Sequence, residues 1–264
     1  MRLYLINLGR RSDRLAAMQA QAIPLGLALD RIDALDAATA QPDAVDGWFA
    51  AGGPLGVIPR GDKCCLLSHR RAWETFVATG QGHAVFLEDD VRLSPAAGAL
   101  LAGDDWIPAN VDVVKLEHYG PPGQRVLLTD VRKAGEDSAL GRMLSRHTGA
   151  AAYILSRAAA QMLLAEKRFD LPVDHLLFNP NNSALFAALA PWQLVPAIAR
   201  QEQFDAGPTR EKSDIEQTRV GLRTFSLAYV KRELVRFAYD LRLIPRQLWA
   251  LAWGAKFKKI DTSL

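Results

Sequence analysis

Three consecutive carboxylates, Glu88, Asp89 and Asp90, directly follow an apolar run at residues 84–87. Such a run is typical of a buried strand that ends at the edge of a sheet. Because alternate side chains of a strand share a face, Glu88 and Asp90 can converge on one point while Asp89 faces away. Clustered hard oxygen ligands suit Mg²⁺ or Mn²⁺, the ions that bridge diphosphates. The residues alone leave a second interpretation open, a solvated acidic turn that leads into Ser94 and Pro95.

Other polar residues near predicted element ends suit phosphate or nucleoside binding. Asn7 is either a hydrogen-bonding anchor for a nucleoside or a residue of turn chemistry. Arg11 and Arg14 provide cations for phosphate or form a solvated helix face. Ser68 lacks a Gly-x-Ser-x-Gly elbow, which argues against a nucleophilic role. His69 is either a polar contact to a donor or a hydrogen-bonded histidine at a helix start.

Strands and helices alternate along the chain. The pattern predicts strands at 3–6, 29–32, 84–88, 111–116 and 150–155, and helices at 12–24, 68–77 and 156–167, the last capped by Ser156. Residues 37–60 read as a binding loop and 120–142 as a polar excursion with short strands. This alternation favours an α/β fold with a mainly parallel, doubly wound sheet. In such a sheet ligands bind beyond the carboxyl ends of the strands, where Asn7 and residues 88–90 fall.

Composition describes an ordinary globular chain with an uneven charge. The 264 residues are 49% hydrophobic and 23% charged, enough for one large domain with an appendage. Residues 219–264 carry ten Lys and Arg against three Asp and Glu, a net charge of +7, whereas residues 1–218 carry −4. A basic tail of this kind indicates a membrane surface or a nucleic acid as partner.

The cysteines and the termini predict an intracellular protein. Cys64 and Cys65 are adjacent, without disulfide or metal-ligand spacing, and read as reduced thiols. The apolar residues 3–8 are too short for a signal peptide, and no stretch approaches the roughly 20 apolar residues of a membrane span.

Five motifs in order resemble glycosyltransferase family 25, the galactosyltransferases of bacterial lipopolysaccharide and lipooligosaccharide synthesis. The similar segments are the Asn-Leu-x-Arg-Arg-x-Asp-Arg-like start at residues 6–14, the Gly-x-x-Gly-Cys-x-x-Ser-His-like block at 61–69, the metal motif at 87–91, the small-residue strand at 148–153 and the acidic motif at 171–174. Lys63 and Cys64 depart from the family pattern, as do Asp36 and Ala37.

The resemblance implies a GT-A-type nucleotide-binding domain at residues 1–204 and a site for each substrate. It implies Mn²⁺ or Mg²⁺ held by Glu88, Asp89 and Asp90, with His175 as a further ligand. It assigns the UDP-sugar donor to Asn7, Leu8, Arg11, Arg14, Ser68, His69, Thr148, Gly149 and Gln201. For Thr148 and Gly149 the alternative is a glycine that eases strand packing. Asp174 reads as a helix N-cap and is the first candidate for the general base or a metal-supporting acid; Glu117 is the second base candidate.

The extension at residues 205–264 contains an amphipathic pattern. Leu227, Val230, Leu234, Phe237, Leu241 and Ile244 follow helical spacing, and Pro245 is expected to interrupt the helix before Trp249, Trp253 and the cluster Lys256, Phe257, Lys258 and Lys259. Two interpretations stay open, a helix packed on the catalytic domain and an interfacial anchor on anionic lipid. Nucleic-acid binding lacks a recognisable motif.

Taken together, the sequence predicts an inverting, metal-dependent transferase of galactose from UDP-galactose onto a lipid-linked bacterial glycan. The resemblance alone supplies the sugar and the acceptor. The alternatives are transfer of another sugar such as glucose, a catalytically silent sugar-nucleotide-binding scaffold, and a metal-dependent phosphohydrolase. The expected location is the cytoplasm, peripheral on the inner face of the cytoplasmic membrane.

Overall fold

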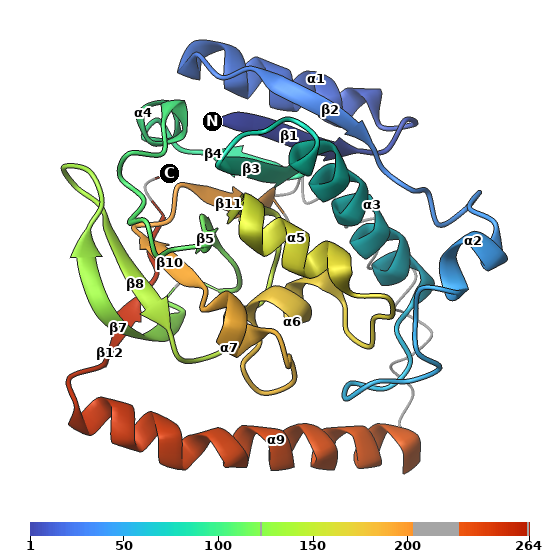
Figure 1. The fold of residues 1–264 in the computed structure, drawn as a ribbon, viewed down its shortest axis with the longest axis vertical. Helices are drawn as coiled ribbons and strands as arrows, with labels where there is room; N and C mark the ends of the chain where they lie inside the picture. The colour runs from blue at the N-terminus through green and yellow to red at the C-terminus, as the bar shows by residue number, and fades with distance from the viewer. Residues whose placement is uncertain (122, 203–226, 263) are drawn as a thin grey trace.

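Two sheets and the helices around them form the fold of the computed structural model (Figure 1), which describes residues 1–121, 123–202, 227–262 and 264. The larger sheet has the strand order β12-β7-β8-β10-β5-β9-β3-β1-β2, and the smaller one the order β4-β11-β6. The strands of the larger sheet are β1 Arg2–Asn7, β2 Leu29–Asp33, β3 His83–Glu88, β5 Val113–Lys115, β7 Arg125–Lys133, β8 Ala139–Met143, β9 Ala152–Ser156, β10 Trp192–Val195 and β12 Lys256–Lys259. Those of the smaller sheet are β4 Val91–Leu93, β6 Glu117–His118 and β11 Ala199–Gln201.

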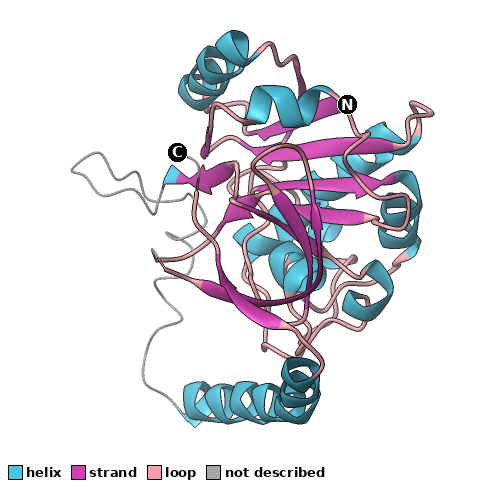
Figure 2. Ribbon diagram, turned by 90° about the vertical axis from the view of Figure 1, so that its left-hand side faces the viewer, coloured by secondary structure: helices cyan, strands magenta, loops and turns pink. Residues whose placement is uncertain are grey.

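Helices cover both faces of the larger sheet, as Figure 2 shows from the side. The described helices are α1 Ser12–Ala22, α2 Pro42–Asp46, α3 Arg60–Val77, α4 Ala97–Ala102, α5 Arg157–Ala165, α6 Val173–Phe178, α7 Phe186–Leu189 and α9 Leu227–Ala252, with a 3₁₀ turn at Ile23–Leu25. Alternate strand residues separate two buried cores, because successive side chains of a strand point to opposite faces. Tyr4 and Tyr153 pack with Trp73 of α3 on one face, and Leu5 packs with Met18 of α1 on the other.

The larger sheet is mixed, so the expectation of a mainly parallel sheet is wrong. Strands β1, β2 and β3 pair in parallel, as do β5 and β10. Strand β9 instead pairs antiparallel with both β3 and β5, and β7, β8, β10 and β12 continue with antiparallel pairs. The apolar run at residues 150–155 predicts a strand buried on both faces but carries no information on its direction, which depends on how the preceding β7–β8 hairpin returns the chain.

One edge of the sheet nevertheless collects the predicted polar residues. In the parallel strands, Asn7 lies opposite Asp33, and Ile6 lies opposite Glu88. Because β9 runs the other way, the residues that precede it, including Gly149, reach the same edge, where Leu87 lies opposite Ala152. In a parallel sheet only the carboxyl ends of strands would meet at this edge. Here the amino end of β9 lies there as well.

Several element boundaries differ from the sequence-based expectation. The helix expected at 68–77 begins at Arg60, so it takes in the whole block of residues 61–69. The loop expected at 37–60 contains the short helix α2. Pro172, rather than Asp174, occupies the N-cap of α6, and Asp174 lies in its first turn.

The C-terminal region also differs from the expectation. Helix α9 continues through Pro245, and the segment with Lys256 and Phe257 is a strand, β12, which pairs antiparallel with β7. In Figure 1 α9 lies along one end of the molecule. None of the described helices is long and apolar enough to cross a membrane. The side chains of Leu227, Val230 and Leu234, and residues 205–226, lie outside what the structure describes.

Candidate active site

The three adjacent carboxylates lie at the end of β3, and each has a different environment. Asp89 is the one held by polar neighbours. Asn7 Nδ2 donates to Asp89 Oδ2 at 2.7 Å, and Arg14 Nη1 donates to Asp89 Oδ1 at 3.1 Å. Burial raises the pKa of Asp89, while these hydrogen bonds and the Arg14 charge oppose that rise. The structure therefore directs Asn7 and Arg14 toward Asp89.

Asp90 differs because one of its buried oxygens has no hydrogen-bond donor among the described residues, although the charge of Arg14 acts on it. Its side chain is 8% exposed, and its Oδ1 has no hydrogen-bond partner within the described part of the chain. Burial, followed by the charge of Glu88, raises the pKa of Asp90 to about 8. A buried, unpartnered carboxylate oxygen is costly unless a cation accompanies it. These hard oxygens fit a divalent cation such as Mg²⁺ or Mn²⁺.

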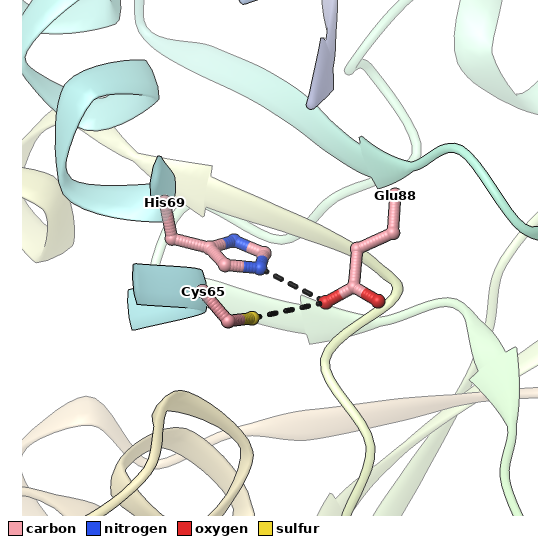
Figure 3. Close-up of side chains that lie close together, drawn as sticks. All are labelled: Cys65, His69 and Glu88. Atoms are coloured by element: carbon pink, nitrogen blue, oxygen red, sulfur yellow. Dashed lines mark hydrogen bonds and ion pairs between the residues drawn. The ribbon is translucent and has the colours of Figure 1, made fainter. Parts of the chain in front are cut away.

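Three groups from two elements, α3 and β11, hold Glu88 in place. His69 Nε2 lies 3.1 Å and Cys65 Sγ 3.7 Å from Glu88 Oε1, as Figure 3 shows. On the other oxygen, Gln201 Nε2 donates to Glu88 Oε2 at 3.3 Å. His69 is fully buried and Gln201 nearly so, so both lie behind the carboxylate. The structure shows both side chains orienting Glu88, which for His69 is the hydrogen-bonded alternative; a direct contact of either with the donor stays a prediction.

A chain of buried groups continues behind His69. Trp73 Nε1 donates to the Tyr153 hydroxyl oxygen at 2.9 Å, and that hydroxyl lies 2.7 Å from His69 Nδ1. The indole can only donate, so the Tyr153 proton is available for His69 Nδ1, which leaves the ring proton on Nε2 to face Glu88. The hydrogen bonds thus fix the ring in the tautomer that supports the carboxylate.

A cavity of about 480 Å³ opens in front of the three carboxylates. Of the predicted donor-binding residues, Leu8, Arg14 and Ser68 line it, and Arg10 and Arg60 add positive charge. Ser68 Oγ donates to Cys64 O and accepts from Leu35 N, both within 2.8 Å, which ties α3 to the segment after β2. Arg11 lies outside this lining and pairs with Asp13 at 2.7 Å.

A second cavity, of about 530 Å³, contains the later acidic motif. Asp174, His175 and Thr148 line it. Gly149 N donates to Asp174 Oδ2 at 3.4 Å, and His175 Nε2 lies 4.0 Å from the same oxygen. The structure thus separates His175 and Asp174 from the carboxylates at residues 88–90, which line the other cavity.

Cys65 lies between the two cavities. Its pKa is raised well above the ordinary value, first by burial and then by the charges of Glu88, Asp62 and Asp174. Because Glu88 lines the first cavity and Asp62 and Asp174 line the second, one thiol is close to groups of both. The two cavities are therefore neighbours across the start of α3, an arrangement that suits two substrates.

Glu117 lies away from both cavities. It is fully buried, accepts from Lys115 Nζ at 2.8 Å and from Ala151 N at 2.8 Å, and keeps a buried Oε2 without a partner in the described residues. Burial raises its pKa, and Lys115 opposes the rise. Lys115 also donates to Gly149 O. The pair thus supports the backbone before β9, and the structure does not bring Glu117 to an acceptor site.

Some site residues escaped the sequence analysis. Cys65 was read only as a reduced thiol, although it stands one helical turn before His69, a spacing that places both on one helix face. Asp62 carries no signal of its own. Tyr153 and Lys115 were predicted only as strand residues, because a strand pattern carries no information on which buried polar groups form hydrogen bonds with each other.

Comparison with known proteins identifies the family. The sequence model described as "Glycosyltransferase family 25 (LPS biosynthesis protein)" matches residues 1–177. The chain belongs to glycosyltransferase family 25. Lacto-N-neotetraose biosynthesis glycosyltransferase LgtB of Neisseria gonorrhoeae is 30% identical over 220 residues, which cover 76% of this chain and 75% of that protein.

Two more distant relatives extend the comparison. Lipooligosaccharide biosynthesis protein lex-1 of Haemophilus influenzae is 28% identical over 55% of this chain and 51% of its own. A glycosyltransferase 25 family member of Aedes aegypti is 30% identical over 69% of this chain and 32% of its own. This family 25 chain is therefore a glycosyltransferase.

Proposed function

We propose that this glycosyltransferase moves a hexose, galactose from UDP-galactose, onto a lipooligosaccharide or other lipid-linked glycan, with inversion and with Mn²⁺ or Mg²⁺. The observation that carries the proposal is the buried, unpartnered Oδ1 of Asp90 beside a cavity with Arg10, Arg14 and Arg60. Oxygen ligands for a hard cation and arginines for phosphate are what a nucleoside diphosphate requires. The choice of galactose follows the family resemblance and the lipooligosaccharide relatives.

The metal would be held by Asp90 and Glu88. When bound, a divalent cation supplies Lewis acidity toward the charge that develops on the departing diphosphate. His69 and Gln201 hold Glu88 in place for it, and Asn7 and Arg14 hold Asp89. These contacts fix the carboxylates before the donor arrives, which reduces the reorganisation needed during reaction.

The second cavity is the proposed acceptor site. Asp174 lines it with a side chain that is 21% exposed, and the Gly149 amide orients one of its oxygens. A carboxylate so placed can accept the proton of the acceptor hydroxyl while that oxygen attacks the anomeric carbon. Asp174 therefore takes precedence over the buried Glu117 as the general base.

The test combines donor screening with one substitution. Mass spectrometry of the purified protein with Mn²⁺, a panel of UDP-sugars and cell-envelope glycan acceptors should detect hexose transfer, most strongly with UDP-galactose. Asp174→Asn should lower transfer by about 100-fold or more while UDP binding stays within a factor of two. Asp170→Asn, an exposed neighbour that lines neither cavity, is the matched control.

Other outcomes favour the alternatives. Preference for UDP-glucose would change the sugar alone, and phosphate release without glycan product would indicate a phosphohydrolase. UDP binding without transfer to any acceptor would indicate a sugar-nucleotide-binding scaffold. Unchanged turnover of the Asp174 variant would remove it from the mechanism.

Helix α9 supports a second proposal, namely that the protein docks through this helix on the anionic inner face of the cytoplasmic membrane. Phe237, Leu241, Ile244, Leu248 and Leu251 follow helical spacing and are each 37–62% exposed, so the described part of the apolar stripe lies outside the core. Exposed basic residues lie on the opposite face of the helix, Arg242 and Arg246, and on the following strand β12, Lys256, Lys258 and Lys259. An exposed apolar stripe with nearby cations matches an interfacial helix.

Point substitutions test this docking better than truncation, because β12 belongs to the sheet. The triple variant Leu241→Ser, Ile244→Ser, Leu248→Ser should lose most co-sedimentation with phosphatidylglycerol vesicles while its melting temperature is kept. Ala238→Ser with Ala252→Ser, at exposed positions of the same helix, is the control. High salt should weaken binding of the wild-type chain. Unchanged vesicle binding, or a switch from dimer to monomer in the triple variant, would contradict membrane docking.

A further inference from the structure

We propose that Cys65, His69 and Glu88 form a binding site for Zn²⁺, which shares Glu88 with the proposed hard-cation site but does not include Asp90. The three ligand atoms, Cys65 Sγ, His69 Nε2 and Glu88 Oε1, all lie within 4.8 Å of one another. Figure 3 shows the thiol and the imidazole, one helical turn apart on α3, directed at the same carboxylate oxygen. Two residues on one helix turn and a third at a strand end thus converge without any rearrangement of the backbone.

The distances suit a small tetrahedral ion. The carboxylate oxygen lies 3.1 Å from the imidazole nitrogen and 3.7 Å from the thiol sulfur. Zinc with bonds of roughly 2.0–2.3 Å places its ligand atoms about 3–4 Å apart. One sulfur, one nitrogen and one oxygen ligand leave a fourth position open, as in zinc sites with three protein ligands. A thiolate ligand favours Zn²⁺ over Mg²⁺ and Mn²⁺, which prefer oxygen.

Zinc binding requires the His69 tautomer opposite to the one that faces Glu88 in the metal-free protein, and the surrounding groups can accommodate it. A ligating histidine carries its proton on the nitrogen that faces away from the metal, and the Tyr153 oxygen, 2.7 Å from His69 Nδ1, can accept it. Trp73 holds that tyrosine, and Gln201 holds the other oxygen of Glu88. When zinc binds, the thiol proton leaves to solvent and the ring proton moves to Nδ1.

Access and charge also favour the ion. Cys65 and Glu88 line the 480 Å³ cavity, so a cation reaches them from solvent. The charges of Glu88, Asp62 and Asp174 act on the Cys65 sulfur and attract a divalent cation to it. Zinc in this position engages Glu88 and so opposes the Mn²⁺-dependent donor binding, a consequence that rests on the proposed function.

Cobalt provides a test that needs no enzymatic turnover. Metal-free full-length protein titrated with Co²⁺ should develop a thiolate-to-cobalt charge-transfer band at one equivalent, and Zn²⁺ should displace it. Cys65→Ser should abolish the band and weaken Zn²⁺ binding by about 100-fold or more, since even the loss of a residue that only hydrogen-bonds to a ligand costs about 10–100-fold in metal affinity. Cys64→Ser is the matched control, because this cysteine lies next along α3, lines the same cavity and stands outside the cluster; it should keep both properties.

Two further variants make the result decisive. His69→Gln should also lose tight Zn²⁺ binding. This variant tests the site independently if the Cys65 variant does not fold. Asp90→Asn should retain the cobalt band, because its carboxylate is not among the three ligands. Absence of the band from the wild-type chain, its persistence in Cys65→Ser, or its loss in Asp90→Asn would overturn this zinc site. Each of these results is independent of whether the chain transfers galactose.

Discussion

At the scale of single residues, adjacent carboxylates acquire different properties from their neighbours. Asp89 accepts hydrogen bonds from two side chains, and each oxygen of Glu88 has a hydrogen-bond partner. Asp90 has one buried oxygen for which the described residues provide no donor. Burial penalises a charge most where hydrogen bonds do not compensate it. Asp90 is therefore the residue at which a bound cation would gain most.

The residue-scale prediction concerns Asp90→Asn. A carboxyl group whose folded pKa, about 8, lies above its unfolded value destabilises the protein as pH rises from that unfolded value toward 8. The neutral amide removes this penalty, so the variant should be more stable at pH 8 by at least about 1 kcal/mol, one pKa unit of interaction. It should also lose Mn²⁺-dependent UDP binding. Denaturant unfolding and calorimetric titration measure the two effects; retained metal-dependent binding would contradict the metal assignment.

At the scale of elements, the site depends on how β9 begins. Gly149 has a φ of +87°, and a Cβ atom there would lie 2.5 Å from Tyr119 Cδ2. Its carbonyl accepts from Lys115, and its amide donates to Asp174. The glycine thus places the backbone between the buried Lys115–Glu117 pair and the second cavity. Both the close packing and the backbone conformation require a glycine there.

Gly149→Ala should therefore lower the free energy of unfolding for two reasons, backbone strain and a steric clash with Tyr119, and a control variant can separate them. Gly26 has a φ of +68°, and a Cβ atom added there would have no other atom within 4 Å, so Gly26→Ala carries the backbone strain alone. We expect a loss of about 1 kcal/mol for Gly26→Ala and at least about 2 kcal/mol for Gly149→Ala, since overpacking adds to strain. Urea unfolding measures both. Equal losses would show that Tyr119 moves aside without cost.

At the scale of the whole molecule, buried polar groups join the two sheets. His147 Nδ1 lies 2.8 Å from Gln193 Oε1, and Tyr119 N donates to His147 Nε2 at 3.1 Å. Gln193 lies on β10 and donates to carbonyls of Lys115 and Glu117. A neutral ring with its proton on Nδ1 donates to Gln193 Oε1 and accepts from Tyr119 N, whereas a protonated Nε2 would lose the bond from Tyr119 N and could donate only to Tyr119 O, 3.2 Å away.

This network predicts the acid stability of the protein. Burial, followed by the charge of Lys115, lowers the pKa of His147 to about 3 from an ordinary value near 6.5. Between these values the unfolded chain binds the extra proton, so this contribution is full above about pH 6.5 and falls with decreasing pH by up to roughly 1.4 kcal/mol per pH unit. His147→Gln should flatten the dependence of unfolding free energy on pH between 4 and 6. A variant with the wild-type slope would show that another group controls acid unfolding.

The sequence by itself determined the family and much of the position of the candidate site. Apolar runs placed β1, β2 and β3, and the rule for strand ends placed Asn7 and the carboxylates together, because parallel strands end at a common edge. The family motifs lie at or next to elements that the local sequence pattern predicts. The amphipathic spacing also predicted the helix α9, and the sequence predicted Ser156 as a helix cap, whose Oγ accepts from Ala159 N.

Only the tertiary structure decided which groups meet. The direction of β9, the division of Asp174 and Asp90 between two cavities, and the burial of Glu117 depend on contacts between residues far apart in the chain. The same holds for the side of α9 that is exposed, since an amphipathic pattern does not say whether protein or another surface covers its apolar stripe. Local spacing encodes what a residue can do, whereas burial and partners, which set its pKa and its orientation, arise only when the chain has folded.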